Sequence, residues 1–126
     1  MITTQVHDKF KVFVGQLAPD QTIGKLAEEV AAFAKSAGVA AKSIGVEYLE
    51  SHRRLLITLG YRDDTPGYSI QLHSVKLGKI DTQAGSFERL EKAMGEAAGK
   101  LENIICHELY LTEGDEFVMV FMTHGE

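Results

Sequence analysis

The sequence predicts an α+β domain of two layers, and three observations support this prediction. Two segments repeat large apolar residues at spacings of three and four, which is the period of an amphipathic helix. Six other segments alternate apolar and polar residues, which is typical of strands with one buried face. Along the chain these segments read strand, helix, strand, strand, and then the same again. We therefore expect a duplicated β-α-β-β unit that forms a six-stranded, largely antiparallel sheet with both helices on one face.

Each predicted helix is defined by an apolar stripe. The stripe of the first helix is made by Ile23, Leu26, Val30, Phe33 and Ala37. The stripe of the second is made by Phe87, Leu90, Met94, Ala97 and Leu101. Thr22 and Ser86 precede these stripes and are suitable N-cap residues, whereas Gly38 follows the first stripe and suits the left-handed residue that ends many helices.

The strands are expected where the alternation has a period of two. They are predicted at Phe10 to Leu17, Lys42 to Glu50, Leu55 to Arg62, Tyr68 to Leu77, Ile104 to Thr112 and Phe117 to His124. Turn-forming residues separate two of the pairs, at Asp63 to Gly67 and at Glu113 to Asp115.

A single domain is expected to cover residues 1–126, with repeat 1 at about 9–62 and repeat 2 at about 68–124. The two helix stripes align without a gap, and the final hairpins align Tyr48 with Tyr110. One unit alone would leave its sheet edges unpaired, so pairing two units would cover some of them. The alternative is that two unrelated units of this kind look alike in sequence.

Composition excludes several classes of protein. The chain has 126 residues, of which 44% are hydrophobic and 25% charged, a profile typical of globular proteins. Its net charge of −5 argues against a nucleic-acid partner, because phosphate binding depends on lysine and arginine. A lone cysteine, Cys106, suits a reducing compartment. The first ten residues lack the features of a secretory signal, and no apolar segment approaches the roughly 20 residues of a membrane span, so we expect a cytoplasmic protein.

The stretch from Cys106 to Tyr110 is the best candidate for part of a site. Neighbouring strand residues point to opposite faces, so His107 and Glu108 cannot both be buried. Aligning the two repeats places Cys106 and Glu108 where the first repeat has Ile44 and Val46, which predicts that Glu108 faces inward. The local pattern favours His107 instead, because it shares a face with the apolar residues Ile105, Leu109 and Leu111. We follow the repeat alignment.

An inward Glu108 would be suited to bind a cationic or hydrogen-bonding ligand, because a buried carboxylate needs a partner. The alternative is a glutamate paired with lysine or arginine across the sheet. Tyr48, Tyr68 and Tyr110 are candidates to line the same pocket, or are packing residues. An inward His107 would be a core histidine.

No catalytic, metal or cofactor site is expected. The histidines have no metal-ligand spacing, and no phosphate-binding glycine motif occurs. Cys106 and His107 cannot act as a nucleophile and base, because adjacent strand residues point apart. Residues distant in sequence could still meet in the fold, so an enzyme is a third hypothesis rather than an excluded one.

Small residues line both helices and predict a close contact. They are Gly24, Ala27, Ala31 and Ala34 in the first helix, and Gly95, Ala98 and Gly99 in the second. Such residues let two helix backbones approach closely. The first interpretation is that the two helices pack together within one chain. The second is a homodimer contact through Ala27, Ala31, Gly95 and Gly99, and the third is that the glycines are tolerated.

The doubled β-α-β-β order from Phe10 to His124 resembles that of the GyrI-like effector-binding domains. A single unit is similar to dodecin, a small flavin-binding oligomer. The first resemblance implies that ligands lie between the two repeats. The function that we expect is therefore non-enzymatic binding of a small molecule in that groove, with Glu108, Tyr48 and Tyr110 lining it.

A second resemblance supports a different function. Without its first strand, the predicted order is helix, three strands, helix and two strands, which is similar to type III secretion chaperones. Those proteins are also small, acidic and dimeric, although their final helix is missing here. This resemblance implies a dimeric module that binds proteins.

Overall fold

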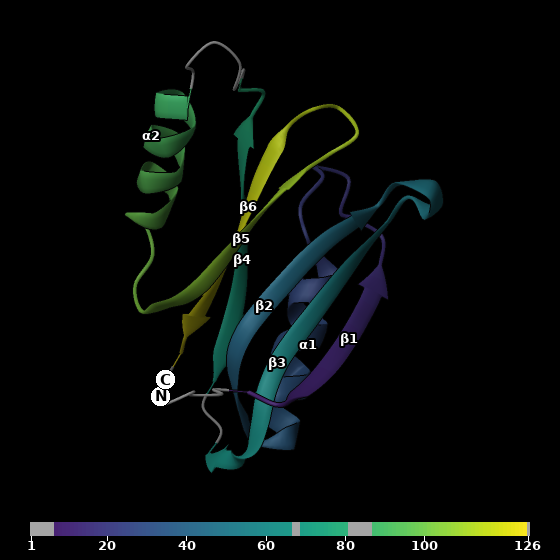
Figure 1. Ribbon diagram of the computed structural model, residues 1–126, viewed down its shortest axis with the longest axis vertical. Coiled ribbons are helices and arrows are strands. Elements are labelled where there is room, and N and C mark those ends of the chain that lie inside the picture. Colours follow the sequence, from purple (N-terminus) through teal and green to yellow (C-terminus); the bar gives the residue numbers. More distant parts are fainter. Residues whose placement is uncertain (1–6, 67–68, 81–86, 126) are drawn as a thin grey trace, which may run out of the picture.

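The computed structural model describes residues 7–66, 69–80 and 87–125, which fold into two helices and six strands (Figure 1). Their order repeats strand, helix, strand, strand, and the α+β class is confirmed. The elements are β1 (Lys9–Gly15), α1 (Lys25–Ala37), β2 (Val39–Leu49), β3 (Arg54–Pro66), β4 (Ile70–Gly78), α2 (Phe87–Ala98), β5 (Ile104–Leu111) and β6 (Phe117–His124). A short 3-10 helix, Glu50–His52, joins β2 to β3.

The strands form two antiparallel sheets of three, where the sequence predicted a single sheet of six. The N-terminal sheet has the order β1-β3-β2, and the C-terminal sheet has the order β4-β6-β5. In each half the third strand therefore lies between the first and the second. The halves share this order, and their common origin stays a prediction.

The two sheets adjoin where β2 lies beside β5. This sheet boundary has no continuous ladder, although the Cys106 side chain has a backbone hydrogen bond with Ile44 across it. Both boundary strands have register shifts near their starts, between Ala41 and Ser43 in β2 and between Ile104 and Cys106 in β5. Bulges of this kind bend a strand and increase its twist. Such bends occur in both of the strands that meet at this boundary.

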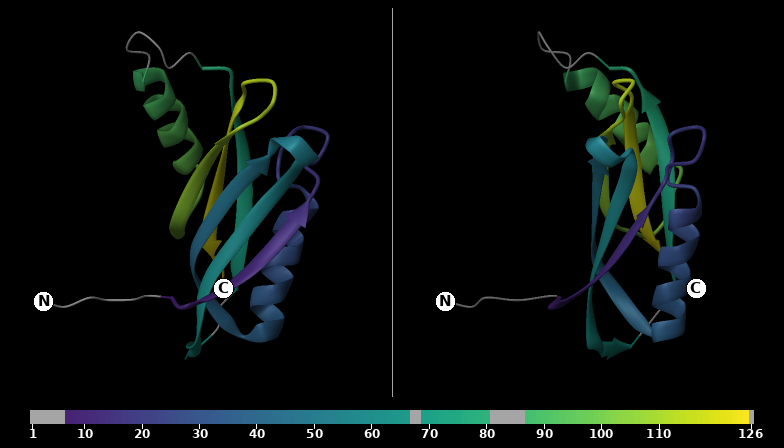
Figure 2. Two further views of the ribbon diagram at one scale, coloured as in Figure 1. Left: turned by 45° about the vertical axis from the view of Figure 1, so that its right-hand side comes forward. Right: turned by 90° about the vertical axis from the view of Figure 1, so that its right-hand side faces the viewer.

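The main core lies between the two sheets and α1, and it contains residues from both halves of the chain. Its buried members are Ile23, Leu26, Val30, Ala34, Ala41, Ile44, Leu55, Ile57, Leu59, Ile70, Leu72, Tyr110, Val118, Val120 and Met122. Helix α1 contacts β4 of the C-terminal sheet as well as β1 and β2 of its own (Figure 2). The first helix therefore packs against both halves.

A second, smaller core lies beneath α2, where Ala97 packs with Met119 and Phe121. Successive residues of β6 alternate between faces, so Val118 and Val120 enter the main core while Met119 and Phe121 enter the second. The helices consequently cover opposite faces of the C-terminal sheet, which differs from the predicted arrangement on one face (Figure 1). The physical reason is that β6 carries apolar side chains on both faces, and each face is buried by packing against other elements.

The end of α1 agrees with the sequence prediction, whereas its start does not. Gly38 adopts a left-handed conformation with φ of 64°, and its amide donates to the Ala34 carbonyl. At the other end the N-cap is Gly24, with φ of 48° and no side-chain cap. Thr22 does not cap the helix because its hydroxyl and amide both donate to the Asp20 carboxylate. The predicted cap Ser86 lies outside the described residues.

The small residues do not bring the two helices together, since α1 and α2 pack on opposite faces of β6. A Cβ built at Gly95 meets no atom within 4 Å, and one built at Gly99 meets only carbonyl oxygens of its own helix. The proposed homodimer through these faces stays a prediction. Among the described residues, no helix has the length and apolar character needed to cross a membrane.

Candidate functional site

Glu108 lies at the sheet boundary, half-buried, on the face of β5 that also carries Cys106 and Tyr110. His107 lies on the opposite face and is exposed. The repeat alignment therefore located Glu108 better than the local apolar pattern did. Ile105 is half-buried against the main core rather than on the face of His107, because the register shift next to it interrupts the alternation.

A hollow of about 180 Å³ opens beside Glu108. It is lined by Gly45, Val46, Glu47, Leu56, Thr58 and Glu108. The first five residues belong to β2 and β3 and the last to β5, so the hollow lies between the two halves of the chain. We call it the Glu108 hollow.

Gly45 keeps this hollow open. It pairs with Thr58 across the ladder, and a Cβ built at Gly45 would lie 2.5 Å from the Thr58 hydroxyl oxygen. A side chain at position 45 would therefore displace Thr58 and fill the space between the two strands. Two residues further along β2, Glu47 lies opposite Leu56. The absence of a side chain at Gly45 thus leaves a space that the polar side chains of Glu47, Thr58 and Glu108 surround.

The charged side chains of the hollow are both acidic. Glu47 is exposed and Glu108 is half-buried, and the Thr58 hydroxyl lies beside them. Between described residues, ion pairs join Arg53 to Glu113 and Lys76 to Glu116, and neither pair includes Glu47 or Glu108. Among the described residues, lysine or arginine therefore does not neutralise Glu108 across the sheet, which was the alternative prediction. Two carboxylates in one hollow favour a cation.

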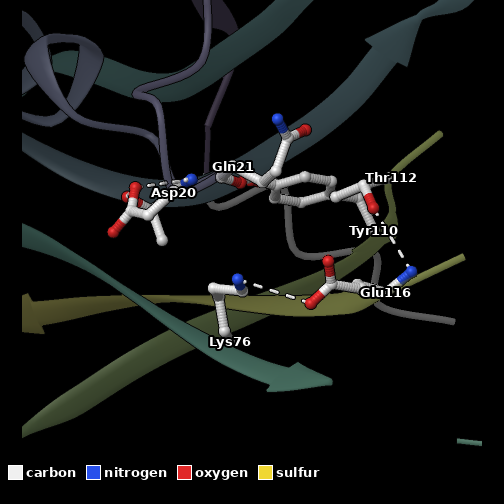
Figure 3. Close-up of polar contacts among 7 residues, drawn as sticks. Asp20, Gln21, Lys76, Tyr110, Thr112 and Glu116 are labelled. Atoms are coloured by element: carbon white, nitrogen blue, oxygen red, sulfur yellow. Dashed lines mark hydrogen bonds and ion pairs between the residues drawn. The ribbon is translucent and has the colours of Figure 1, made fainter. Parts of the chain in front are cut away.

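Tyr110 is not among the residues that line the Glu108 hollow. Its side chain is buried, and its hydroxyl donates a hydrogen bond of 2.7 Å to the Gln21 carbonyl in the loop before α1 (Figure 3). Burial raises the pKa of the Tyr110 phenol well above its ordinary value, and the charge of Asp20 adds to that effect. The hydroxyl is already bonded, so Tyr110 ties the two halves together rather than contacting a ligand.

The same loop is stabilised by local polar contacts. The hydrogen bonds from Thr22 hold the pKa of the Asp20 carboxyl below its ordinary value. Gln21, next in the chain, has a φ of 68°, which is uncommon for a residue other than glycine. Nearby, the Lys76 ammonium lies 3.4 Å from the Glu116 carboxylate, and the Glu116 amide donates to the Thr112 hydroxyl (Figure 3). The contacts between Thr22 and Asp20 fix the loop that receives Tyr110.

Tyr48 lines a separate hollow of about 200 Å³. The residues around it are Gln16, Leu17, Gln21, Tyr48, Arg53 and Glu113. Burial and a hydrogen bond with Glu113 raise the pKa of the Tyr48 phenol. The predicted groove lined jointly by Glu108, Tyr48 and Tyr110 is thus divided, and only Glu108 lies in the hollow between β2, β3 and β5. Tyr68 lies outside the described residues.

Cys106 is a packing residue. Its thiol donates a weak hydrogen bond of 3.9 Å to the Met122 sulfur, and its side chain packs against the main core. Burial raises the pKa of this thiol, which lowers the fraction present as the reactive thiolate. With His107 on the other face of β5, no nucleophile and base pair forms here.

Two features of the surface were missed by sequence reasoning. The first is a hollow of about 450 Å³ at the end of the C-terminal sheet. In it the His73 Nε2 and Thr123 Oγ1 atoms lie 3.0 Å apart, within hydrogen-bond distance. These residues are 50 positions apart, and only the strand register brings them together. The second is an exposed apolar row on β1, made by Phe10, Val12 and Val14. Its alternation was visible in the sequence, but alternation alone does not say whether the apolar face is covered.

Comparisons with protein-family models, with curated proteins and with solved structures found no match. Among the described residues, no group of three or more histidine, cysteine, aspartate or glutamate side chains is placed to hold a metal ion.

Proposed function

We propose that this protein is a non-enzymatic binding domain that holds a small organic cation in the Glu108 hollow. The observation that carries the proposal is the position of Glu108, half-buried in a hollow between the two halves of the chain. A half-buried carboxylate is stabilised by an opposite charge, so a cationic ligand would complement it. Glu47 supplies a second carboxylate at the rim, and Leu56 supplies apolar contact.

The size of the hollow limits the ligand. A volume of about 180 Å³ is below the roughly 300 Å³ at which sites for drug-sized ligands begin. We therefore expect an alkylamine, diamine or methylated amine. The net charge of −5 also favours the approach of a cation.

Thermal denaturation with a panel of small ions tests the proposal. The panel consists of putrescine, choline and guanidinium, with butyrate as an anion of similar size. We expect at least one cation to raise the midpoint, because a ligand at about ten times its Kd stabilises a protein by about 1.4 kcal/mol. That gain corresponds to a shift of about 4 to 6 °C in a chain of this size.

The variant Glu108→Gln should abolish the shift, since it removes the charge and keeps the shape. Glu96→Gln provides the matched control, because Glu96 is an exposed residue of α2 away from the hollow. The proposal fails if no cation shifts the midpoint, or if the shift in Glu108→Gln equals that of the unmodified chain.

Protein binding is a second candidate function, and one specific observation favours it. Three large apolar side chains, Phe10, Val12 and Val14, are exposed by 64%, 54% and 46% on one strand at the edge of a sheet. An apolar row of this kind is suited to contact with another polypeptide. Phe10→Ser should weaken such a contact without changing any amine effect at Glu108, because it adds no charge and Phe10 lies opposite Gly60 rather than opposite a residue of the hollow. This variant separates the two functions.

A further inference from the structure

Strand β1 is an edge strand with an unusual surface. It pairs with β3 on one side, and no other strand of the described residues pairs with its second side. Phe10, Val12 and Val14 alternate with Lys9, Lys11 and Phe13, so the three exposed apolar side chains project from one face. His7 packs edge-on against Phe10 at one end of this row. The free side and the apolar row belong to the same strand.

Strand β1 carries two charged side chains of the kind that protects edges, Lys9 and Lys11, but it has no proline and no bulge. Its seven residues, KFKVFVG, contain no proline, and all seven pair with β3 from Tyr61 to Leu55 without a register shift. Proline, bulges and outward charges are the devices that stop edge strands from pairing with other chains. A regular strand with a free side is therefore a template for an added strand.

We infer that β1 pairs antiparallel with β1 of a second copy of this chain, in a register centred on Val12. This inference is independent of the Glu108 hollow, and it deepens the second candidate function by naming the partner. In this register Val12 lies opposite Val12, and Phe10 of one copy lies opposite Val14 of the other. Apolar side chains then meet apolar side chains along the whole exposed row.

The charges of β1 and the number of paired residues together select this register. A centre on Phe13 also avoids like charges, but it pairs only residues 11–15 of the strand. A centre on Lys11 would place two lysines directly opposite each other, and a centre on Phe10 would place Lys9 opposite Lys11. Like charges in such pairs are destabilising. A shift of the register by one residue would set the apolar row opposite the lysines. The centre on Val12 instead places Lys9 opposite Gly15 and Lys11 opposite Phe13, and it pairs all seven residues.

The environment of Lys11 supports this arrangement. In one chain its ammonium already lies 5.6 Å from the centre of the Phe33 ring, and Phe13 packs edge-on against the same ring at 6.0 Å. A facing Phe13 from the second copy would extend these aromatic surroundings of the ammonium. The two N-terminal sheets would become one sheet of six strands across the dimer. The twofold pairing uses the free side of β1 in both copies, so the assembly closes at two.

Disulfide crosslinking tests the register in a Cys106→Ser background. Opposed strand residues have Cα atoms about 4.5 to 5.5 Å apart, which is within the range that a disulfide spans. Val12→Cys should therefore form a crosslinked dimer on oxidation. Val14→Cys is the matched control, because its two copies would lie four residues, or about 13 Å, apart along the strands. Mixing Phe10→Cys with Val14→Cys should crosslink the two variants.

Sedimentation of the unmodified chain tests the dimer itself. We expect a concentration-dependent dimer, and Val12→Asp should raise its dissociation constant at least tenfold while circular dichroism stays unchanged. A monomer at 100 µM by sedimentation, or a dimer unaffected by Val12→Asp, would overturn the inference. Crosslinking of Val14→Cys as efficient as that of Val12→Cys would overturn the register. Loss of the dimer in Gly95→Glu but not in Val12→Asp would place the contact on the helix faces instead.

The amine assay keeps this result separate from the proposed function. Any midpoint shift produced by a cation should be the same in Phe10→Ser, a second variant that should weaken the dimer, as in the unmodified chain, because Phe10 lies opposite Gly60 and not opposite a residue that lines the Glu108 hollow. A monomeric chain that still responds to cations through Glu108 overturns the dimer alone, whereas a dimer without that response overturns the binding site alone.

Discussion

Tyr110 shows how one side chain can connect two halves of a chain. It is only 6% exposed, and its hydroxyl donates to the Gln21 carbonyl across 89 positions of sequence. Tyr110→Phe removes this donor and leaves the carbonyl without it, so we expect the free energy of unfolding to fall by about 1 to 2 kcal/mol. Urea denaturation measures the loss. Tyr48→Phe is the control and should cost less than about 0.5 kcal/mol, because its hydroxyl meets the exposed Glu113.

The same variant gives a pH test. Burial raises the pKa of Tyr110 in the folded state, whereas an unfolded tyrosine ionises near pH 10. The folded state therefore keeps its proton when the unfolded state has lost it. Stability from this group is fully present below about pH 10 and is lost as the pH rises further. The difference in stability between the unmodified chain and Tyr110→Phe should shrink between about pH 10 and pH 11. A constant difference would contradict this mechanism.

At the scale of a helix, Gly95 lowers the stability of α2 relative to alanine at the same position. It lies inside the helix and is exposed, and a methyl group added there would meet no atom within 4 Å. Gly95→Ala should therefore raise the free energy of unfolding by about 0.5 to 1 kcal/mol. Thermal denaturation measures the change.

Gly24→Ala is the matched control for Gly95→Ala. Gly24 has a φ of 48°, and a Cβ there would lie 2.9 Å from the Ala18 Cβ. The same chemical change should destabilise the protein at this position, since the backbone conformation is one that alanine avoids. A gain at both positions would mean that the local environments do not determine the effect.

The elements themselves were largely predictable because their signals are local. The stripe residues Ile23, Leu26 and Val30 are all buried, and the last strand was placed at Phe117–His124 as observed. Local structure explains the errors. Asp20 binds Thr22 and so removes it as a helix cap, and the predicted turn beginning at Asp63 lies in β3, which continues to Pro66.

The arrangement of the whole molecule could not be read from periodicity. Each half was expected to place its helix on a shared face, but the apolar run from Val118 to Met122 gives β6 two buried faces. The candidate site was only partly predictable for the same reason. Comparing the halves placed Glu108 on the correct face, whereas its separation from Tyr48 depends on how the two sheets meet. That contact involves residues far apart in sequence, and a local pattern carries no information about it.

Because the main core takes residues from both halves, we expect the chain to unfold as one cooperative unit. Ile57 of β3 and Met122 of β6 are both fully buried in this core. Ile57→Ala and Met122→Ala should each lower the free energy of unfolding by about 2 to 5 kcal/mol. Amide hydrogen exchange locates the effect, since the slowest amides report global opening. Each variant should reduce the protection of β3 and β6 by the same amount.

Met94→Ala is the contrasting variant, because Met94 is a residue of α2 and packs against the second core. Its loss should reduce protection most in α2, which borders the main core least. If Ile57→Ala weakened β3 and left the protection of β6 unchanged, the two halves would open independently, and the core that joins them would contribute little. In that case a ligand in the Glu108 hollow could not stabilise both halves at once. Equal loss of protection in β3 and β6 would instead mean that anything bound at the sheet boundary acts on the stability of the entire fold.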